Sequence, residues 1–144
     1  MTQEEKELLL KDLCARLPYG VIVRHADSLI DSDGNDTGRF WYKHGYLCDV
    51  CTLDGMTTTI IESEGSDREG YEHICFLERT LPYLRPMSSM TEEEKREYSL
   101  TKTLSIVDYP TLESFDWLNK NHFDYRGLIP KNIALDCTGL HIYD

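Results

Sequence analysis

The chain has 144 residues, of which 26 are acidic and 15 basic, so its formal net charge is −11. This length suits a single domain over residues 1–144, large enough to bury a core without staples. A hydrophobic content of 40% argues against disorder. The charge argues against nucleic-acid binding, because the basic residues that would neutralise phosphates are scattered along the chain.

A helix is predicted over residues 3–17. Thr2 and Glu5 form a capping-box pair at its start, in which each side chain can bond to the backbone N–H of the other residue. Leucines four residues apart give this helix one apolar face. Pro18 disfavours helical geometry at Leu17, so the helix is expected to end there and to pack its apolar face on the rest of the chain.

Residues 20–80 are predicted to be β structure, because β-branched and aromatic residues alternate with turn formers. The expected strands are 21–23, 39–42, 46–53, 57–61 and 71–77. Turn formers crowd the run 31–38, Asp54-Gly55 is a hairpin signal, and the polar run 65–70 is a further connection. A calcium loop beginning at Asp31 would need a glycine and a final acid that are absent, so a solvated turn is expected.

Helices are predicted again after residue 86. A second capping box, Thr91 with Glu94, opens a short helix that ends near Leu100. Another helix opens at Pro110-Thr111, and the tail 133–143 is expected to form a final short strand pair. The fold class predicted is α+β: an N-terminal helix, an antiparallel sheet or small barrel of four or five strands, and two C-terminal helices that cover one face.

Metal chemistry is the first functional alternative. Cys48-x-x-Cys51 and His73-x-Cys75 supply residue types that suit a tetrahedral zinc site. On a regular strand, however, Cys48 and Cys51 point to opposite faces, and cysteine is commonly a small buried hydrophobe. We therefore expect no stoichiometric zinc and no other cofactor, and keep a small metal-binding protein or enzyme that uses these four residues as the alternative function.

The cysteines also bear on location. Their number is odd, and the N-terminal residues lack the basic and apolar regions of a signal peptide, which indicates reduced thiols and a cytoplasmic protein. The chain contains five of them: Cys14, Cys48, Cys51, Cys75 and Cys137. The longest purely apolar run has three residues, so no membrane partner is expected.

Protein interaction is the leading functional hypothesis. No nucleophile elbow, phosphate-binding loop or metalloprotease motif occurs, so no catalytic residue is predicted. Aromatic residues cluster at 40–42 and 123–125, and exposed Trp, Tyr and Arg side chains anchor many protein interfaces. These features favour a non-catalytic interaction or regulatory module whose partner is another protein with a basic surface, although both clusters could also pack in the core.

The predicted binding residues are Arg85, Asp124, Tyr125 and Arg126. A proline follows Arg85 and a glycine follows Arg126, so both segments are expected to be connections between elements. Binding residues concentrate in such connections. In the competing interpretation, Arg85 pairs with Asp124 or with another carboxylate and fastens the linker to the helix.

Three segments carry a resemblance: KDLCARLPYGV at 11–21, YLRPMSSMTEEE at 83–94 and FDYRGLI at 123–129. In these segments the chain resembles a group of short proteins common in gut anaerobic bacteria and in their phages and mobile elements. The resemblance brings no activity, cofactor or catalytic residue. Its association with mobile elements implies a regulatory or host-interaction role rather than housekeeping metabolism.

Overall fold

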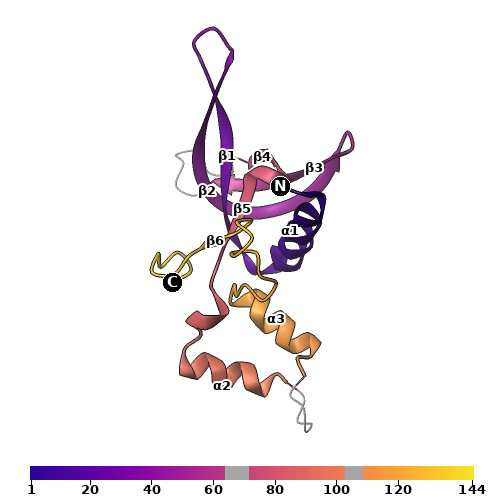
Figure 1. Cartoon of the computed structure of the whole chain (residues 1–144), viewed down its shortest axis with the longest axis vertical. Helices are drawn as coiled ribbons and strands as arrows, with labels where there is room; N and C mark the ends of the chain where they lie inside the picture. The colour runs from indigo at the N-terminus through magenta and orange to yellow at the C-terminus, as the bar shows by residue number, and fades with distance from the viewer. Residues whose placement is uncertain (64–71, 103–108) are drawn as a thin grey trace.

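The fold is α+β, as predicted, in a computed structural model that describes residues 1–63, 72–102 and 109–144. Within these residues a mixed six-stranded sheet, open rather than closed into a barrel, is accompanied by three α-helices (Figure 1). The strands are β1 Ile22–Ile30, β2 Asp36–Leu53, β3 Met56–Ser63, β4 Glu72–Phe76, β5 Thr80–Leu84 and β6 Leu135–Asp136. The helices are α1 Gln3–Arg16, α2 Glu92–Leu100 and α3 Leu112–Lys120.

Helix α1 begins with the predicted capping box. The Thr2 side chain accepts a hydrogen bond from the Glu5 N–H at 3.2 Å, and the Glu5 carboxylate accepts one from the Thr2 N–H at 2.7 Å. The α-helix ends at Arg16, one residue before the predicted end, and a short 3-10 turn over Leu17–Tyr19 follows. Leu9 and Leu13 are fully buried in the main core, and Leu8, Leu10 and Leu17 pack against it partly buried, so the predicted helix and its packing role are confirmed.

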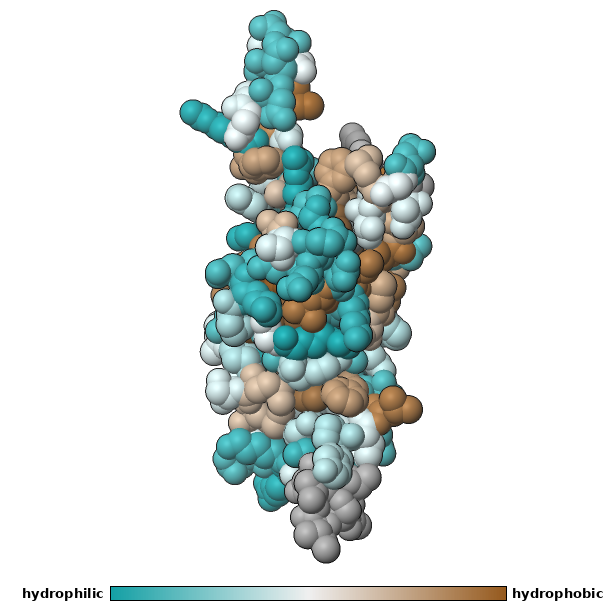
Figure 2. Space-filling view, turned by 45° about the vertical axis from the view of Figure 1, so that its right-hand side comes forward, coloured by the Kyte–Doolittle hydropathy of each residue, from teal (hydrophilic) through white to brown (hydrophobic). Residues whose placement is uncertain are grey.

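Strand β2 is a single strand of 18 residues, not the two strands predicted on either side of Gly45. Its first part pairs with β1 and its second part with β3. A side chain at residue 45 would collide with the Glu62 carbonyl group and with Ile61, so the glycine permits a close approach of strands rather than a turn. The β1–β2 hairpin projects far beyond the body of the protein (Figures 1 and 2).

The sheet curls so that strands at different places in its order meet on the inner face. The order is β4-β3-β2-β1-β5-β6, which puts two strands between β1 and β4. Even so, the Cys75 thiol of β4 donates to the Ala26 carbonyl oxygen of β1 at 3.6 Å. The main core fills this curl and continues to α1 and to the segment after α3: Leu9, Leu13, Val21, Val23, Leu47, Ile61, Cys75, Leu77, Leu84, Leu128, Ile133 and Ala134.

The C-terminal half departs from the prediction in two ways. Strand β5 was not predicted, and its parallel pairing with β6 makes the sheet mixed rather than antiparallel. The expected strand pair in the tail is wrong, because the tail contributes only the two-residue β6. The connection 65–70, and the start of the strand predicted at 71–77, lie outside the described residues.

Helices α2 and α3 begin where predicted but do not cover the sheet. Thr91 and Thr111 cap their N-termini with capping boxes. Both helices lie beyond the end of the sheet, opposite the projecting hairpin (Figure 1). They share a separate small core built on Met90, Leu118 and Phe123. We call this part, together with the segment 121–129, the helical base.

Candidate functional site

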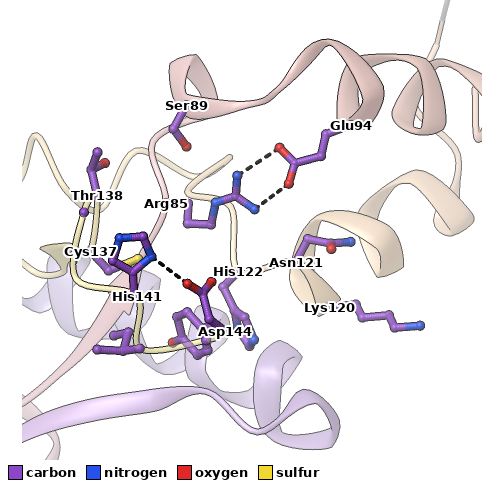
Figure 3. Close-up of a pocket in the computed structure, with 13 residues that line it drawn as sticks. Arg85, Ser89, Glu94, Lys120, Asn121, His122, Cys137, Thr138, His141 and Asp144 are labelled. Carbon is purple, nitrogen blue, oxygen red and sulfur yellow. Dashed lines mark hydrogen bonds and ion pairs between the residues drawn. The ribbon is translucent and has the colours of Figure 1, made fainter.

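The predicted binding residue Arg85 lies at the top of the helical base and is held by intramolecular contacts. Its guanidinium group donates to both carboxylate oxygens of Glu94 at 2.8 and 2.9 Å (Figure 3) and stacks 4.3 Å from the centre of the Phe123 ring. This pairing lowers the pKa of Glu94. Backbone hydrogen bonds join Arg85 to His122 and Asp124, so Arg85 and Asp124 do meet, although the side-chain partner of Arg85 is Glu94.

The other three predicted binding residues are also engaged by contacts with other residues of the chain. Asp124 is buried, and its carboxylate accepts from the backbone N–H groups of Leu128 and Ile129, both at 2.8 Å. The Tyr125 hydroxyl donates to the Asn119 side chain at 3.1 Å, and the Arg126 guanidinium stacks 4.7 Å from the Tyr125 ring centre. These contacts favour a role in positioning the segment.

A buried ion pair fastens helix α1 to this segment. Asp12 and Arg16 are fully buried and meet in two hydrogen bonds of 2.8 and 3.0 Å. Arg16 also donates to the Phe123 carbonyl oxygen at 2.7 Å, and the Arg126 Nε atom lies 3.3 Å from the Asp12 carboxylate. The sequence analysis missed this cluster, although Asp12 and Arg16 stand four apart on a predicted helix.

A cavity of about 450 Å³ lies between the base and the C-terminal tail and has Arg85 in its wall. The His122 and Tyr143 rings stack there at 3.7 Å, and His141 pairs with Asp144 at 2.6 Å (Figure 3). Burial lowers the pKa of His122 to about 4 and raises that of Tyr143. Both ring groups are therefore neutral at physiological pH, and the charged groups in the wall are of both signs, so the lining selects no single class of ligand.

A second hollow, of about 230 Å³, lies on the outer face of β1 and β2 and is walled by aromatic and arginine side chains. The Arg24 guanidinium lies 4.5 Å from the centre of the Tyr42 ring, and that of Arg79 lies 4.8 Å from the centre of the Phe40 ring. Phe40 is 43% exposed and Tyr42 56%. We call these four residues, with Leu81, the aromatic–arginine face.

Two polar residues of β1 meet Cys75 inside the curl. His25 is fully buried, and neither of its ring nitrogens has a hydrogen-bond partner. Its Nδ1 atom lies 4.0 Å from a carboxylate oxygen of Asp27, and the ligand atoms of His25, Asp27 and Cys75 lie within 4.8 Å of one another. The ring of His73 is 5.3 Å from that of His25, centre to centre.

The predicted metal set is therefore brought together only in part. Cys48 is exposed and its thiol donates to the Tyr46 carbonyl oxygen, while the Cys51 sulfur contacts the Thr58 hydroxyl at 3.3 Å. Within residues 1–63, 72–102 and 109–144, Cys75 gathers instead with His25 and Asp27. The sequence held a signal for His25 and Asp27. They follow Val21 and Val23 at every second position, and alternate residues of a strand share one face, here the inner face of the sheet.

Comparison of the chain with protein-family models, curated proteins and solved structures finds no match. The resemblance to proteins of gut anaerobes and their mobile elements accordingly stays a prediction. Among the described residues, no helix has the length and apolar character needed to cross a membrane.

Proposed function

We propose that this protein is a non-catalytic interaction module that binds another protein through the aromatic–arginine face. The observation that supports this most is the exposure of two aromatic rings, Phe40 and Tyr42, each with an arginine stacked on it and with a hollow beside them. Tyrosine and arginine are enriched among the residues that dominate binding energy at protein interfaces. Stacking also restricts the side chains before binding, which reduces the entropy lost on association.

The position of the face suits contact with a large partner. It lies where the projecting β1–β2 hairpin meets the body, and hydrophobic residues interrupt the hydrophilic surface of that hairpin (Figure 2). The strand pairing places Phe40 opposite Ser28 and Tyr42 opposite Ala26. The residues directly opposite have small side chains, and the β1 residue that stacks on Tyr42 is Arg24, two positions from Ala26.

The acidic hairpin tip and the net charge favour a basic partner, although the face itself carries the cations Arg24 and Arg79. The hairpin tip carries exposed Asp31, Asp33 and Asp36, and the whole chain has a net charge of −11. Acidic groups around an apolar contact steer a basic protein towards it and raise the association rate. The partner proposed is a protein that inserts an apolar side chain into the hollow and presents lysine or arginine around it. With its thiols reduced, the module would act in the cytoplasm.

The other predicted features have narrower roles in this proposal. The contacts of Arg85, Asp124, Tyr125 and Arg126 assign them to holding the helical base together, with only Arg85 lining a cavity. An enzyme or metal protein that uses Cys48, Cys51, His73 and Cys75 has less support. Cys48 and Cys51 lie on β2, outside the cluster that Cys75 forms with His25 and Asp27. The resemblance to mobile-element proteins makes a host protein the expected partner.

The test uses three full-length baits in lysate of the source cells: wild type, Tyr42→Ala and the control Leu112→Ala. Leu112 is 85% exposed and lies on α3, far from the hairpin. The substitution Leu112→Ala therefore removes an exposed apolar side chain without touching the aromatic–arginine face. We expect one protein to be retained by wild type and control, lost with Tyr42→Ala, and eluted as salt rises. The same protein, purified, should bind Tyr42→Ala at least about tenfold more weakly than wild type, since truncating a central aromatic costs about 2 kcal/mol.

Two results would contradict this proposal. One is that wild type and Tyr42→Ala retain the same proteins with the same affinities. The other is that wild-type protein pairs with itself, so that Tyr42→Ala converts a dimer to a monomer; the face would then join copies of this chain instead of binding a different protein.

A further inference from the structure

The polar cluster inside the curled sheet is not explained by protein interaction. A buried polar group that lacks a hydrogen bond costs the protein about 1–3 kcal/mol, so buried nitrogens without partners are uncommon. His25 has two such nitrogens and is fully buried. An occupant that accepts an electron pair would satisfy the one ring nitrogen that carries a lone pair and so remove part of this cost.

From this geometry we propose that His25, Asp27 and Cys75 bind a divalent transition-metal ion of the zinc class. Imidazole nitrogen, thiolate sulfur and carboxylate oxygen are the three donor types that zinc uses in proteins. The site shares only Cys75 with the set predicted from the sequence. It runs against the expectation that the protein contains no stoichiometric zinc, whose reason was the opposed faces of Cys48 and Cys51.

The distances suit an ion after a small adjustment. Tetrahedral zinc, with bonds of about 2.0–2.3 Å, holds its ligand atoms roughly 3.5 Å apart. The 4.0 Å between His25 and Asp27 is close to this and too long for a hydrogen bond, and the three ligand atoms lie within 4.8 Å of one another. The set needs to close by roughly 1 Å, and the Asp27 side chain, which is 32% exposed, has room to move.

Binding of the ion would require a change of protonation at Cys75. Burial lowers the pKa of His25, which keeps the ring neutral and able to coordinate. Burial raises the pKa of Cys75, so the free thiol is protonated; when the ion binds, the thiol releases its proton to solvent and coordinates as thiolate. Affinity should therefore fall as the pH falls.

The ion would join two strands that no backbone pairing connects. His25 and Asp27 belong to β1 and Cys75 to β4, and β2 and β3 stand between them in the sheet. Coordination would thus fasten the curl across its opening and stabilise the fold by mass action. Three protein ligands leave one position of a tetrahedral ion for water or for a further group, and the His73 ring is near.

The test measures zinc and cobalt binding to the purified, reduced full-length chain by equilibrium dialysis and absorption spectroscopy. We expect one ion per chain and, with cobalt, the charge-transfer band of a thiolate–cobalt bond. Cys75→Ser and Asp27→Asn should each weaken binding by more than about tenfold, because even residues that merely support a ligand are worth about 10- to 100-fold. Cys51→Ser and Cys137→Ser are matched controls that should bind like wild type.

Asp27→Asn keeps the test meaningful if Cys75→Ser fails to fold, because the Asp27 side chain is 32% exposed and its replacement has the same shape. Absence of stoichiometric binding to wild type would overturn the proposal. So would binding of equal strength to Asp27→Asn and wild type, or binding that is lost in Cys51→Ser, which would place the metal at the Cys48–Cys51 pair.

Discussion

The helical base and the curled sheet both bury polar side chains, but they treat them differently. Where α1 meets the base, Asp12 and Arg16 are fully buried and bind each other, and Arg16 also binds the Phe123 carbonyl oxygen. Single atoms there, Arg16 Nη1, His122 Nδ1 and Arg126 Nε, still have no hydrogen-bond partner. In the sheet, His25 is equally buried and neither ring nitrogen has a partner. The difference is one of degree: Arg16 keeps several hydrogen bonds, which hold the structure together, whereas His25 has none at either polar atom, which points to something that binds there.

The largest effect on stability is expected from breaking the buried ion pair between Asp12 and Arg16. Asp12→Ala leaves the Arg16 guanidinium buried without its carboxylate, so we expect the free energy of unfolding to fall by about 3–5 kcal/mol. Chemical denaturation of the two proteins measures this. Glu92→Ala removes a carboxylate from a surface pair with Lys95 and should leave stability nearly unchanged. Equal stability of wild type and Asp12→Ala would show that the buried pair does not hold the base.

The base also contains a pH-dependent element, His122. Burial lowers its pKa from 6.5 to about 4, so the folded state favours the neutral ring and the unfolded state binds a proton more readily. Stability is therefore complete above pH 6.5 and falls as the pH drops from about 6.5 to about 4, by roughly 3 kcal/mol in total.

The measurement is the free energy of unfolding against pH for wild type and His122→Asn. Asparagine tolerates the positive backbone φ of 61° at this position and does not titrate in this range. The variant should be less sensitive to acid than wild type between pH 6.5 and 4. Parallel pH profiles for the two proteins would assign the acid sensitivity to other groups, among them His25.

A smaller effect is expected from Arg85→Ala. Loss of the two hydrogen bonds to Glu94 and of the stacking on Phe123 should cost about 1–2 kcal/mol, since Arg85 and Glu94 are both partly buried. Arg39→Ala, on the exposed part of β2, is the matched control and should change stability by less than about 0.5 kcal/mol. If Arg85→Ala is as stable as wild type, Arg85 is available to a partner, as the sequence first suggested.

The sequence predicted the local features of the fold well. The capping boxes at Thr2 and Thr91 depend on residues three positions apart, so their signal is complete within a few residues. Gly45 was predicted to separate two strands, but glycine also occurs inside strands where a neighbouring strand approaches closely. Here the neighbours are Ile61 and Glu62 of β3, and a local reading of the sequence does not include them. Strand β5 was not predicted, and it contains Pro82, a residue that is uncommon inside strands.

The sites were harder to predict because they depend on how the sheet curls. Cys75 meets His25 across 50 positions of sequence only because β1 and β4 face each other inside the curl. The aromatic–arginine face was predicted in part, since Phe40 and Tyr42 stood out, whereas Arg24 and Arg79 come from other segments. For Arg85 the sequence indicated an extended linker but not Glu94 as its partner.

The most direct test of the contrast between the two regions is hydrogen exchange of the backbone amides, resolved by segment, with and without zinc. The account predicts that zinc slows exchange in β1 and β4, which the ion would join, and leaves α3 and residues 122–129 unchanged. Asp27→Asn should show no such slowing at the same zinc concentration. Exchange in β1 and β4 that zinc does not alter, or slowing spread evenly over sheet and base, would contradict the claim that the sheet interior is built to hold an ion.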